Sequence, residues 1–416
     1  MLKVVHISTY EGGGAGRAAY RLHEGLLKQP GIQSIFISAS DTSDFKNTFN
    51  IKLAPKKISL IDRLLKRIGF PITKSHKNLK HLSKLHGSYE CFSFPESDYP
   101  LESLEIIKQA DIIHLHWVAG FVNYPTFFKR FADKNIVWTL HDMNPFMGGF
   151  HYQNDLLNNI SHRSLNNKLL KLKRMSLSKL KHLTIVTPSE WLKEEAIRAG
   201  FFNNFTKFKR IQYGLNLQVF KSANREIAKT KFKLERKIPC ILVIAENLEI
   251  ERKGVDLFCK AIQKLSKETF QVISIGDNRL KIDFDCKIIE LGKISDDRIL
   301  AEAYSAADLI VIPSREDNLP NVLLEAFACG RPVLSFKVGG LIDWIEPGYN
   351  GFLAEAINEN ALREKLEEFI LNPDQFDNIK IRKFAEDNFS QEVQAGRYLR
   401  LYNNVSKLGS QFTDIS

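Results

Sequence analysis

The sequence predicts an α/β protein built from two doubly wound domains. Short runs rich in β-branched residues recur along the chain, and many are followed by a turn and an amphipathic helical pattern. Continuous apolar strands that alternate with helices are typical of parallel sheets covered on both faces. The runs form two series, and 416 residues exceed the size of one ordinary domain. Each series therefore predicts one doubly wound domain.

The first series occupies the N-terminal half of the chain. We expect its strands at residues 3–9, 34–40, 111–117, 135–142 and 183–189. A helical pattern over residues 16–28 follows the first of them.

The second series occupies the C-terminal half. We expect its strands at residues 240–247, 270–277, 287–292, 308–314 and 332–340. A helical pattern over residues 254–265 follows the first of these strands.

The two series are separated near residues 211–226. We therefore expect an N-terminal Rossmann-like domain over residues 1–216 and a C-terminal Rossmann-like domain over residues 217–390. We expect the last helix, residues 391–416, to pack back on the N-terminal domain. Ligands of open parallel sheets bind beyond the carboxyl ends of the strands, and two such domains favour a site in the cleft between them.

The composition excludes some classes of protein but does not identify a ligand. With 44% hydrophobic and 26% charged residues the chain is not globally disordered. Its net charge of +11 is compatible with nucleic acid, an anionic membrane or phosphorylated ligands. The five cysteines contain no C-x-x-C pair, and the N-terminus has no signal-peptide pattern. We expect a cytoplasmic protein, soluble or peripheral, because no apolar run approaches the roughly 20 residues that span a bilayer.

A glycine-rich stretch, "STYEGGGAGRAAYRL", follows the first predicted strand. Gly13, Gly14 and Gly16 permit a close backbone approach, and amides at a helix start attract phosphate. Arg17 occupies the last position of a G-x-G-x-x-G pattern, so the dinucleotide fingerprint is absent, and no G-K-[ST] follows. The stretch indicates phosphate or sugar contact; the alternative is an ordinary strand-to-helix turn.

Histidines end two of the predicted strands in the first half. His141 and Asp142 end one strand, where a histidine can contact a hydroxyl or carry a proton; the alternative is a capping pair. His114 and His116 share one face of the strand before it. A metal site needs a third ligand and none is evident, so we expect one histidine to pack and one to face the cleft.

Two cations follow the first strand of the second series. Arg252 and Lys253 lie directly before Gly254 and a helix. A guanidinium fork and an ammonium point charge at such a loop suit a diphosphate. The alternative is a solvated basic loop.

The stretch "SREDNLPNVLLEAFACG" places two acids at the next strand end. Ser314 ends the strand, Asp317 lies in the loop, and Glu325 lies inside an almost wholly apolar helix. A buried carboxylate needs partners, and sugar hydroxyls could supply them. The alternative is a structural salt bridge. A D-x-D spacing at residues 283–285 precedes a strand in a lysine-rich turn and is interpreted as a solvated loop.

Two segments of the first half are strongly basic. Residues 52–86 hold ten Lys/Arg and one acid, and residues 156–189 hold seven Lys/Arg and no acid. Amphipathic basic helices can dock on anionic lipid, so we expect peripheral contact with the inner face of the cytoplasmic membrane; the alternative is a solvated face. Nucleic acid is not expected as a partner, because no binding motif appears.

Together these stretches resemble glycosyltransferase family 4, a retaining family of GT-B fold. The resemblance is strongest over residues 308–355, where the order of acid, Glu-Ala, Cys-Gly-x-Pro-Val and Gly-Gly is specific. The "DNLPN" and "HDMNPFMGGFHY" sequences look like the branch that builds bacterial exopolysaccharides of the colanic-acid type.

The resemblance implies roles for individual residues. Glu325 would hold the ribose of the donor nucleotide, and Asp317 the donor-sugar hydroxyls. Other donor contacts would come from the diphosphate-binding pair Arg252 and Lys253, the loop Gly13, Gly14 and Gly16, the base-proximal Gly292, and the segment Asn318, Leu319 and Asn321. His141 would contact the transferred sugar; with Asp317, Lys253 and Arg252 it forms the expected catalytic set, and Arg17, His116 and Asp142 are expected on the acceptor side. Two positions depart from the family pattern: Asp317 replaces a Glu, and Asn247, also expected at the donor, stands where an Arg is frequent.

The resemblance implies a metal-independent glycosyltransferase of the hexosyltransferase type (EC 2.4), without a cofactor. It would move a sugar with retention from a GDP- or UDP-linked donor to a saccharide or lipid-linked saccharide, in cell-surface polysaccharide biosynthesis. Protein charges would stabilise the departing diphosphate. The alternatives are a nucleotide-sugar epimerase-like enzyme and a catalytically inactive nucleotide-sugar-binding protein of the same fold; the missing G-x-G-x-x-G argues against an oxidoreductase.

Overall fold

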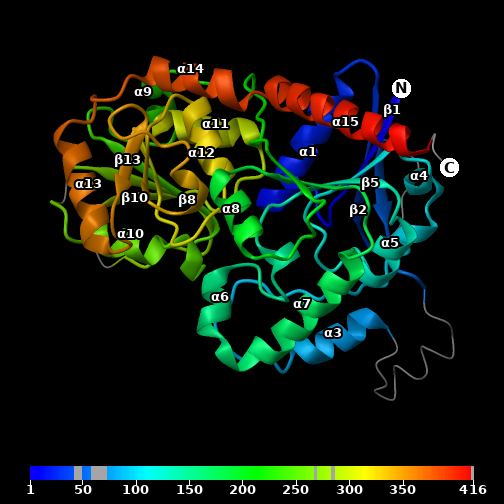
Figure 1. The fold of residues 1–416 in the computed structure, drawn as a ribbon. Coiled ribbons are helices and arrows are strands. Elements are labelled where there is room, and N and C mark those ends of the chain that lie inside the picture. Colours follow the sequence, from blue (N-terminus) through cyan, green and yellow to red (C-terminus); the bar gives the residue numbers. More distant parts are fainter. Residues whose placement is uncertain (42–48, 58–72, 267–268, 283–285, 414–416) are drawn as a thin grey trace. The chain divides into compact units, whose positions relative to one another are not determined.

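The computed structural model describes residues 1–41, 49–57, 73–266, 269–282 and 286–413. It divides into two compact units (Figure 1). The N-terminal unit comprises Met1–Ile211 and Ala395–Ser416, and the C-terminal unit comprises Gln212–Gln394. These boundaries differ by a few residues from the expected 216/217 and 390/391.

The described part of the N-terminal unit contains a parallel sheet of seven strands in the order β3-β2-β1-β4-β5-β6-β7. The strands are β1 (Leu2–Ile7), β2 (Ile32–Ala39), β3 (Asn50–Leu53), β4 (Ile112–Leu115), β5 (Asn135–Thr139), β6 (Leu183–Thr187) and β7 (Lys207–Arg210). The helices before the unit boundary are α1 (Gly13–Leu27), α3 (Lys74–Leu82), α4 (Glu105–Lys108), α5 (Tyr124–Arg130), α6 (Gln153–Asn158), α7 (Arg163–Leu177) and α8 (Glu190–Arg198).

The described part of the C-terminal unit contains a second parallel sheet, of six strands in the order β10-β9-β8-β11-β12-β13. Its strands are β8 (Cys240–Asn247), β9 (Gln271–Asp277), β10 (Lys287–Glu290), β11 (Leu309–Ile312), β12 (Val333–Phe336) and β13 (Gly351–Ala354). Its helices are α9 (Arg225–Lys231), α10 (Val255–Ile262), α11 (Asp297–Ala306), α12 (Asn321–Ala328), α13 (Glu359–Leu371) and α14 (Asn378–Phe389). The doubly wound fold predicted for both halves is therefore confirmed.

In each sheet the strand order reverses beside the first strand of its series. Strand β1 pairs with β2 on one side and with β4 on the other. Strand β8 pairs in the same way with β9 and β11. Loops leave such a switch point in opposite directions and open a crevice beyond the strand ends. Predicted site residues follow the strands at both points: the glycine-rich stretch follows β1, Arg252 and Lys253 follow β8, and Asp317 follows β11.

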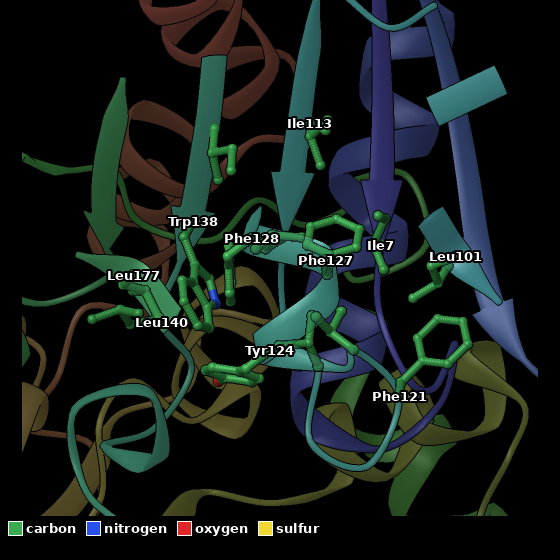
Figure 2. Close-up of a cluster of buried hydrophobic side chains, with 14 of the residues drawn as sticks. Ile7, Leu101, Ile113, Phe121, Tyr124, Phe127, Phe128, Trp138, Leu140 and Leu177 are labelled. Carbon is green, nitrogen blue, oxygen red and sulfur yellow. The ribbon is translucent and has the colours of Figure 1, made fainter. Parts of the chain in front are cut away.

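The core of the N-terminal unit is rich in aromatic rings. Tyr124, Phe127 and Phe128 share one face of α5 because they are spaced three and four residues apart. Phe128 and Tyr124 pack against Trp138 of β5, with ring centroids 5.7 and 5.8 Å away (Figure 2). Burial of these large side chains fixes α5 on its face of the sheet.

The helix α15 (Gln391–Thr413) begins in the C-terminal unit and continues into the N-terminal unit. In Figure 1 it is drawn in red. Ala395, Tyr398 and Tyr402 lie on one of its faces and join a buried cluster with Val4 of β1 and Val137 of β5. This part of α15 therefore covers one face of the N-terminal sheet.

Several boundaries differ from those expected. Strand β5 ends at Thr139, so His141 and Asp142 lie in the loop that follows it rather than in the strand. Helix α1 begins at Gly13, so the predicted glycine turn forms the first turns of the helix. Residues 283–285, which hold the D-x-D spacing, lie outside the described residues. So do residues 59–70, a basic amphipathic pattern within the basic segment 52–86.

Candidate functional site

At the switch point of the C-terminal unit, the loop after β8 packs against the loop after β11. The turn Glu251–Lys253 ends at Gly254, which has a φ of 65°. A Cβ on Gly254 would lie 1.9 Å from the carbonyl oxygen of Pro313. Only glycine permits this approach, so the residue type brings the two cations of one loop to the acid of the other.

Asp317 is the centre of this contact. Its Oδ2 accepts hydrogen bonds from Lys253 Nζ at 2.7 Å and from Ser314 Oγ at 3.1 Å, and Arg252 Nη1 lies 3.5 Å away. Burial of the carboxyl group favours its neutral form, but the charges of Lys253 and Arg252 outweigh that effect and lower the pKa of Asp317. A buried, ionised carboxylate therefore holds the Lys253 ammonium in place.

The two cations have different surroundings. Arg252 is buried, and its Nη1 donates to the carbonyl oxygen of Glu316 at 2.8 Å. Its own carbonyl accepts from the amide of Arg315. Lys253 is only partly buried. Arg252 therefore braces the two loops, and Lys253 is the cation with access to a ligand.

Helix α12 presents Glu325 to the interior of the C-terminal unit. The Glu325 side chain is buried, and Tyr304 of α11 donates its hydroxyl hydrogen to Oε2 at 2.9 Å. Pro320 precedes the helix as its N-terminal cap residue. The helix ends at Ala328, and Gly330 follows with a φ of 68°.

The segment that joins Asp317 to α12 is enclosed. Asn318 and Leu319 are buried, and Asn321, the first residue of α12, is partly buried. The amide of Asn318 donates to Asp317 Oδ1 at 3.0 Å. The carboxylate at the mouth of the helix is thus oriented from both sides.

Asn247 and Gly292 lie on neighbouring parts of the same sheet edge. Asn247 Oδ1 accepts from the amide of Glu249 at 2.8 Å and from Asn278 Nδ2 at 2.9 Å. Gly292 is exposed, and its carbonyl accepts from the amide of Gly276. Asn247 therefore orders the turn after β8.

In the N-terminal unit the glycines form the start of α1. A Cβ on Gly16 would lie 2.5 Å from the carbonyl oxygen of Tyr10. Only glycine therefore lets the backbone of α1 lie this close to Tyr10. Nothing surrounds a Cβ built at Gly14, and Gly13 has a φ of 68°. Arg17 is partly buried on the same helix.

The Asp142 carboxylate accepts hydrogen bonds from residues of its own unit. Its Oδ2 accepts from His151 Nδ1 at 2.6 Å and from Trp117 Nε1 at 2.7 Å, and its Oδ1 accepts from the amide of Asn144. Burial opposes ionisation of both partners, but their pairing lowers the pKa of Asp142 and raises that of His151 to about 10. Asp142 therefore positions Trp117 and His151, and its expected place on the acceptor side stays a prediction.

His141 lies at a small pocket beyond β4 and β5. The pocket is lined by His116, Trp117, Val118, Ala119, Tyr124, His141, Asp142, Asn144 and Pro145. Burial lowers the pKa of His141 to about 4, so its ring is neutral near neutral pH. The polar lining suits a hydroxylated ligand.

His116 lines the pocket described above, whereas His114 packs inside the unit against Tyr402 and Tyr398. The expectation that one of these two histidines packs and the other faces the cleft stays a prediction. Both are buried, and His6 of β1 lies beside them, with one possible ligand atom of each within 4.8 Å of the others. His6 is a third histidine that the H-x-H spacing does not reveal, because it comes from another strand. Both ring nitrogens of His114 are nevertheless hydrogen-bonded, one to the Tyr402 hydroxyl at 2.6 Å and the other to the Thr139 hydroxyl at 2.8 Å. The three rings as arranged therefore do not fit a metal.

Several residues of these sites were not predicted. Tyr304 and Trp117 each bind a predicted residue through a contact distant in sequence, and His151 binds Asp142 from nine residues away. Only His151 carries a local signal, since it lies in the same glycine-containing loop segment as Asp142.

Part of the chain is similar to known proteins. Residues 239–372, which include Lys253, Asp317 and Glu325, match the family model described as "Glycosyl transferases group 1". An uncharacterized glycosyltransferase of Methanocaldococcus jannaschii is 30% identical over 173 residues, covering 40% of this chain and 46% of that protein.

A second relative has a named reaction. The N,N'-diacetylbacillosaminyl-diphospho-undecaprenol alpha-1,3-N-acetylgalactosaminyltransferase of Campylobacter jejuni is 28% identical over 208 residues, covering 47% of this chain and 53% of that protein. The chain therefore spans about half the length of these two relatives.

Solved structures establish the fold over almost the whole chain. Sucrose-phosphate synthase from Thermosynechococcus elongatus superposes with a TM-score of 0.70 at 17% identity, covering 97% of this chain and 99% of that chain. At this identity the likeness concerns the fold alone. The two Rossmann-like domains are those of the GT-B fold.

Proposed function

We propose that this chain, whose residues 239–372 match the group 1 glycosyltransferases, is a nucleotide-sugar-dependent glycosyltransferase. The observation that carries the proposal is the contact between Lys253 and Asp317 at the β8–β11 switch point, followed along the chain by the buried Glu325 of α12. Cations suit a diphosphate, and carboxylates suit sugar and ribose hydroxyls. All three residues lie within the matched segment.

Donor binding exchanges the partners of this cluster. The diphosphate draws Lys253 away from Asp317, and the released carboxylate accepts hydrogen bonds from the donor-sugar hydroxyls. Glu325 binds the ribose, while amides at the start of α12 approach the phosphates. The ion pair seen between Lys253 and Asp317 thus holds both side chains in place before the donor arrives.

The proposed reaction retains the configuration at the anomeric carbon. The bond from that carbon to the diphosphate oxygen breaks, and an acceptor hydroxyl oxygen bonds to the same face of the sugar. The acceptor's proton passes to the departing diphosphate. Lys253 and the helix-start amides stabilise the charge that develops there, so the proposal includes neither a metal nor a cofactor.

The acceptor is proposed to be a saccharide or a lipid-linked saccharide of a cell-surface polysaccharide pathway. The Campylobacter jejuni relative, whose name includes a diphospho-undecaprenol acceptor, supports this class. His141 contacts the transferred sugar in this scheme. The proposed donor is a UDP- or GDP-linked sugar.

Product analysis tests the proposal. Purified protein is incubated with UDP- and GDP-sugars and with lipid-linked saccharide acceptors, and the products are separated by chromatography, which resolves epimers, and identified by mass. Transfer predicts a nucleoside diphosphate and a lengthened acceptor, with activity lost in E325Q and K253A proteins that retain their fold. An altered nucleotide sugar without acceptor indicates an epimerase, and binding without turnover indicates an inactive binding protein; either result contradicts the proposal.

Peripheral membrane contact is a second proposal, based on the surface of α3 and α7. On α3 the side chains of Lys77, Leu79 and Lys80 are exposed, and on α7 Lys171 and Met175 are exposed. Exposed apolar residues among cations suit anionic lipid headgroups. Within the basic segment 156–189, Lys173 is an exception, because it is buried and donates to Asn144. None of the described helices is both long and apolar enough to cross a bilayer.

Vesicle sedimentation tests this contact. We expect binding to vesicles that contain anionic lipid and weaker binding after K171E or L79S substitution. Equal sedimentation with neutral and anionic vesicles, or none with either, contradicts it.

A further inference from the structure

A hydrogen-bonded chain of three histidines runs across the N-terminal sheet. His6 of β1, His116 after β4 and His141 after β5 belong to three neighbouring strands. His6 Nδ1 lies 3.0 Å from His116 Nε2, and His116 Nδ1 lies 3.3 Å from His141 Nε2. All three rings are buried.

The chain is a row of neutral rings. Burial lowers the pKa of His6 and His116 well below the usual value, and the neighbouring histidines lower both further. Burial brings the pKa of His141 to about 4. A neutral imidazole has one N–H and one bare nitrogen, so each ring can donate in only one direction. The three histidines therefore have two possible proton arrangements. In one, each ring donates toward His141, and in the other, each ring donates toward His6.

The far end of the chain distinguishes the two arrangements. His6 Nε2 is buried and has no hydrogen-bond partner among the described residues. If donation runs from His141 toward His6, this nitrogen must carry a buried N–H without an acceptor. If donation runs from His6 toward His141, it carries only a bare lone pair. Orphaned buried N–H groups are rarer than under-satisfied acceptors, so donation toward His141 is favoured.

We propose that His6 and His116 are positioning residues that hold His141 in its Nδ1-protonated tautomer, so that His141 meets the sugar as a hydrogen-bond donor. The inference rests on the proposed function, because it assumes that His141 contacts the transferred sugar. His141 Nε2 accepts from His116 in this arrangement, and the ring's single proton is then on Nδ1.

The arrangement has a consequence for the reaction. A neutral His141 whose Nε2 is occupied by His116 is not a general base for the acceptor hydroxyl. It donates to a sugar oxygen and orients the ring that is being transferred. This agrees with a reaction in which the departing diphosphate takes the acceptor's proton.

A buried metal is the competing explanation of the cluster. It would use His6, His114 and His116. Such a site requires His114 to give up its bond to Tyr402 or Thr139. Stoichiometric metal in the purified protein is therefore an outcome that overturns the proposal.

Paired substitutions at His6 provide the test. In H6N the amide nitrogen of Asn can replace Nδ1 as donor to His116, whereas H6L removes the donor. H23L is the matched control: His23 is also buried, is hydrogen-bonded to Ser34 Oγ at 2.7 Å and packs edge-on against the His6 ring, but lies outside the hydrogen-bonded row of histidines. The tautomer of His141 is measured by long-range proton–nitrogen NMR correlation, alongside kcat, KM and elemental analysis.

We expect a single Nδ1–H tautomer for His141 in the unsubstituted protein, in H6N and in H23L, and a mixture in H6L. We expect kcat to fall on the order of 10- to 100-fold in H6L, with the donor KM little changed, and to recover in H6N. An Nε2–H tautomer in the unsubstituted protein, or an unchanged His141 spectrum in H6L, overturns the proposal. The spectra do not depend on turnover, so an absence of sugar transfer contradicts the proposed function alone.

Discussion

At the scale of single residues, the sequence identifies the chemical groups but not their partners. Lys253, Asp317 and Glu325 are recognisable from their positions after predicted strands and from an ordered motif. The ion pair between Lys253 and Asp317, and the bond from Tyr304 to Glu325, join residues far apart in sequence. Nothing local encodes such contacts, because they depend on how the strands are ordered in the sheet.

Lys253 gives the sharpest prediction at this scale. In K253A the diphosphate loses a charge-assisted partner, so we expect nucleoside diphosphate affinity to fall about 10- to 100-fold. Isothermal titration measures the change. K264A is the control, because Lys264 is a cation of the same unit that faces Glu359 at the surface. Equal affinity in K253A and K264A contradicts the role of Lys253.

At the scale of elements, strong hydrophobic patterns predict strands well and weak ones do not. The ten expected strands all exist, whereas β3, β7 and β13 were not expected. Each of these has only four residues, and β7, "KFKR", is largely exposed. Four residues are too few for a hydrophobic pattern to be recognised, even in β13, where three of the four are buried. The pairing of β8 with β11, which creates the candidate site, is likewise a property of sheet order rather than of any one run.

The loop between β8 and α10 depends on a glycine, and this can be tested. In G254A the new Cβ meets Pro313 and the backbone retains a left-handed conformation. We expect the melting temperature to fall and nucleotide binding to weaken. In G348A the φ of 80° is also left-handed but no atom lies near the Cβ. A loss of stability in G254A no larger than in G348A contradicts the close approach of the two loops.

At the scale of the whole molecule, the N-terminal unit buries histidines in the neutral state. An unfolded histidine has a pKa near 6.5, and burial lowers that of His23 to about 4. Below about pH 6.5 the unfolded chain binds more protons than the folded chain, so the free energy of unfolding falls as the pH decreases. His6, His114 and His116 act in the same direction.

The alkaline side has opposing contributions. His151, with a pKa of about 10, stabilises the folded state below about pH 6.5, and that contribution is lost as the pH rises toward 10. Lys173, with a pKa of about 7 when folded, acts oppositely between about 7 and 10.5. We therefore expect the free energy of unfolding to change little with pH on the alkaline side and to fall steeply with decreasing pH on the acid side.

Denaturant unfolding followed by tryptophan fluorescence checks the acid limb. The free energy of unfolding is expected to rise between about pH 4.5 and 6.5. H23L should reduce this slope by at most about 1.4 kcal/mol per pH unit, because one titrating group is removed. An unchanged slope in H23L, or greater stability at acid pH, contradicts the neutral burial of His23.

The central claim is that the C-terminal unit binds a nucleotide sugar through Glu325 and Lys253. A thermal-shift screen of nucleoside diphosphates and their sugars tests it most directly. At a ligand concentration about 100 times Kd, native-state binding raises the melting temperature by about 5–10 °C. The account predicts such a rise for one nucleoside diphosphate and its sugars, reduced in E325Q. No rise with any nucleotide, or an equal rise in E325Q, would contradict it.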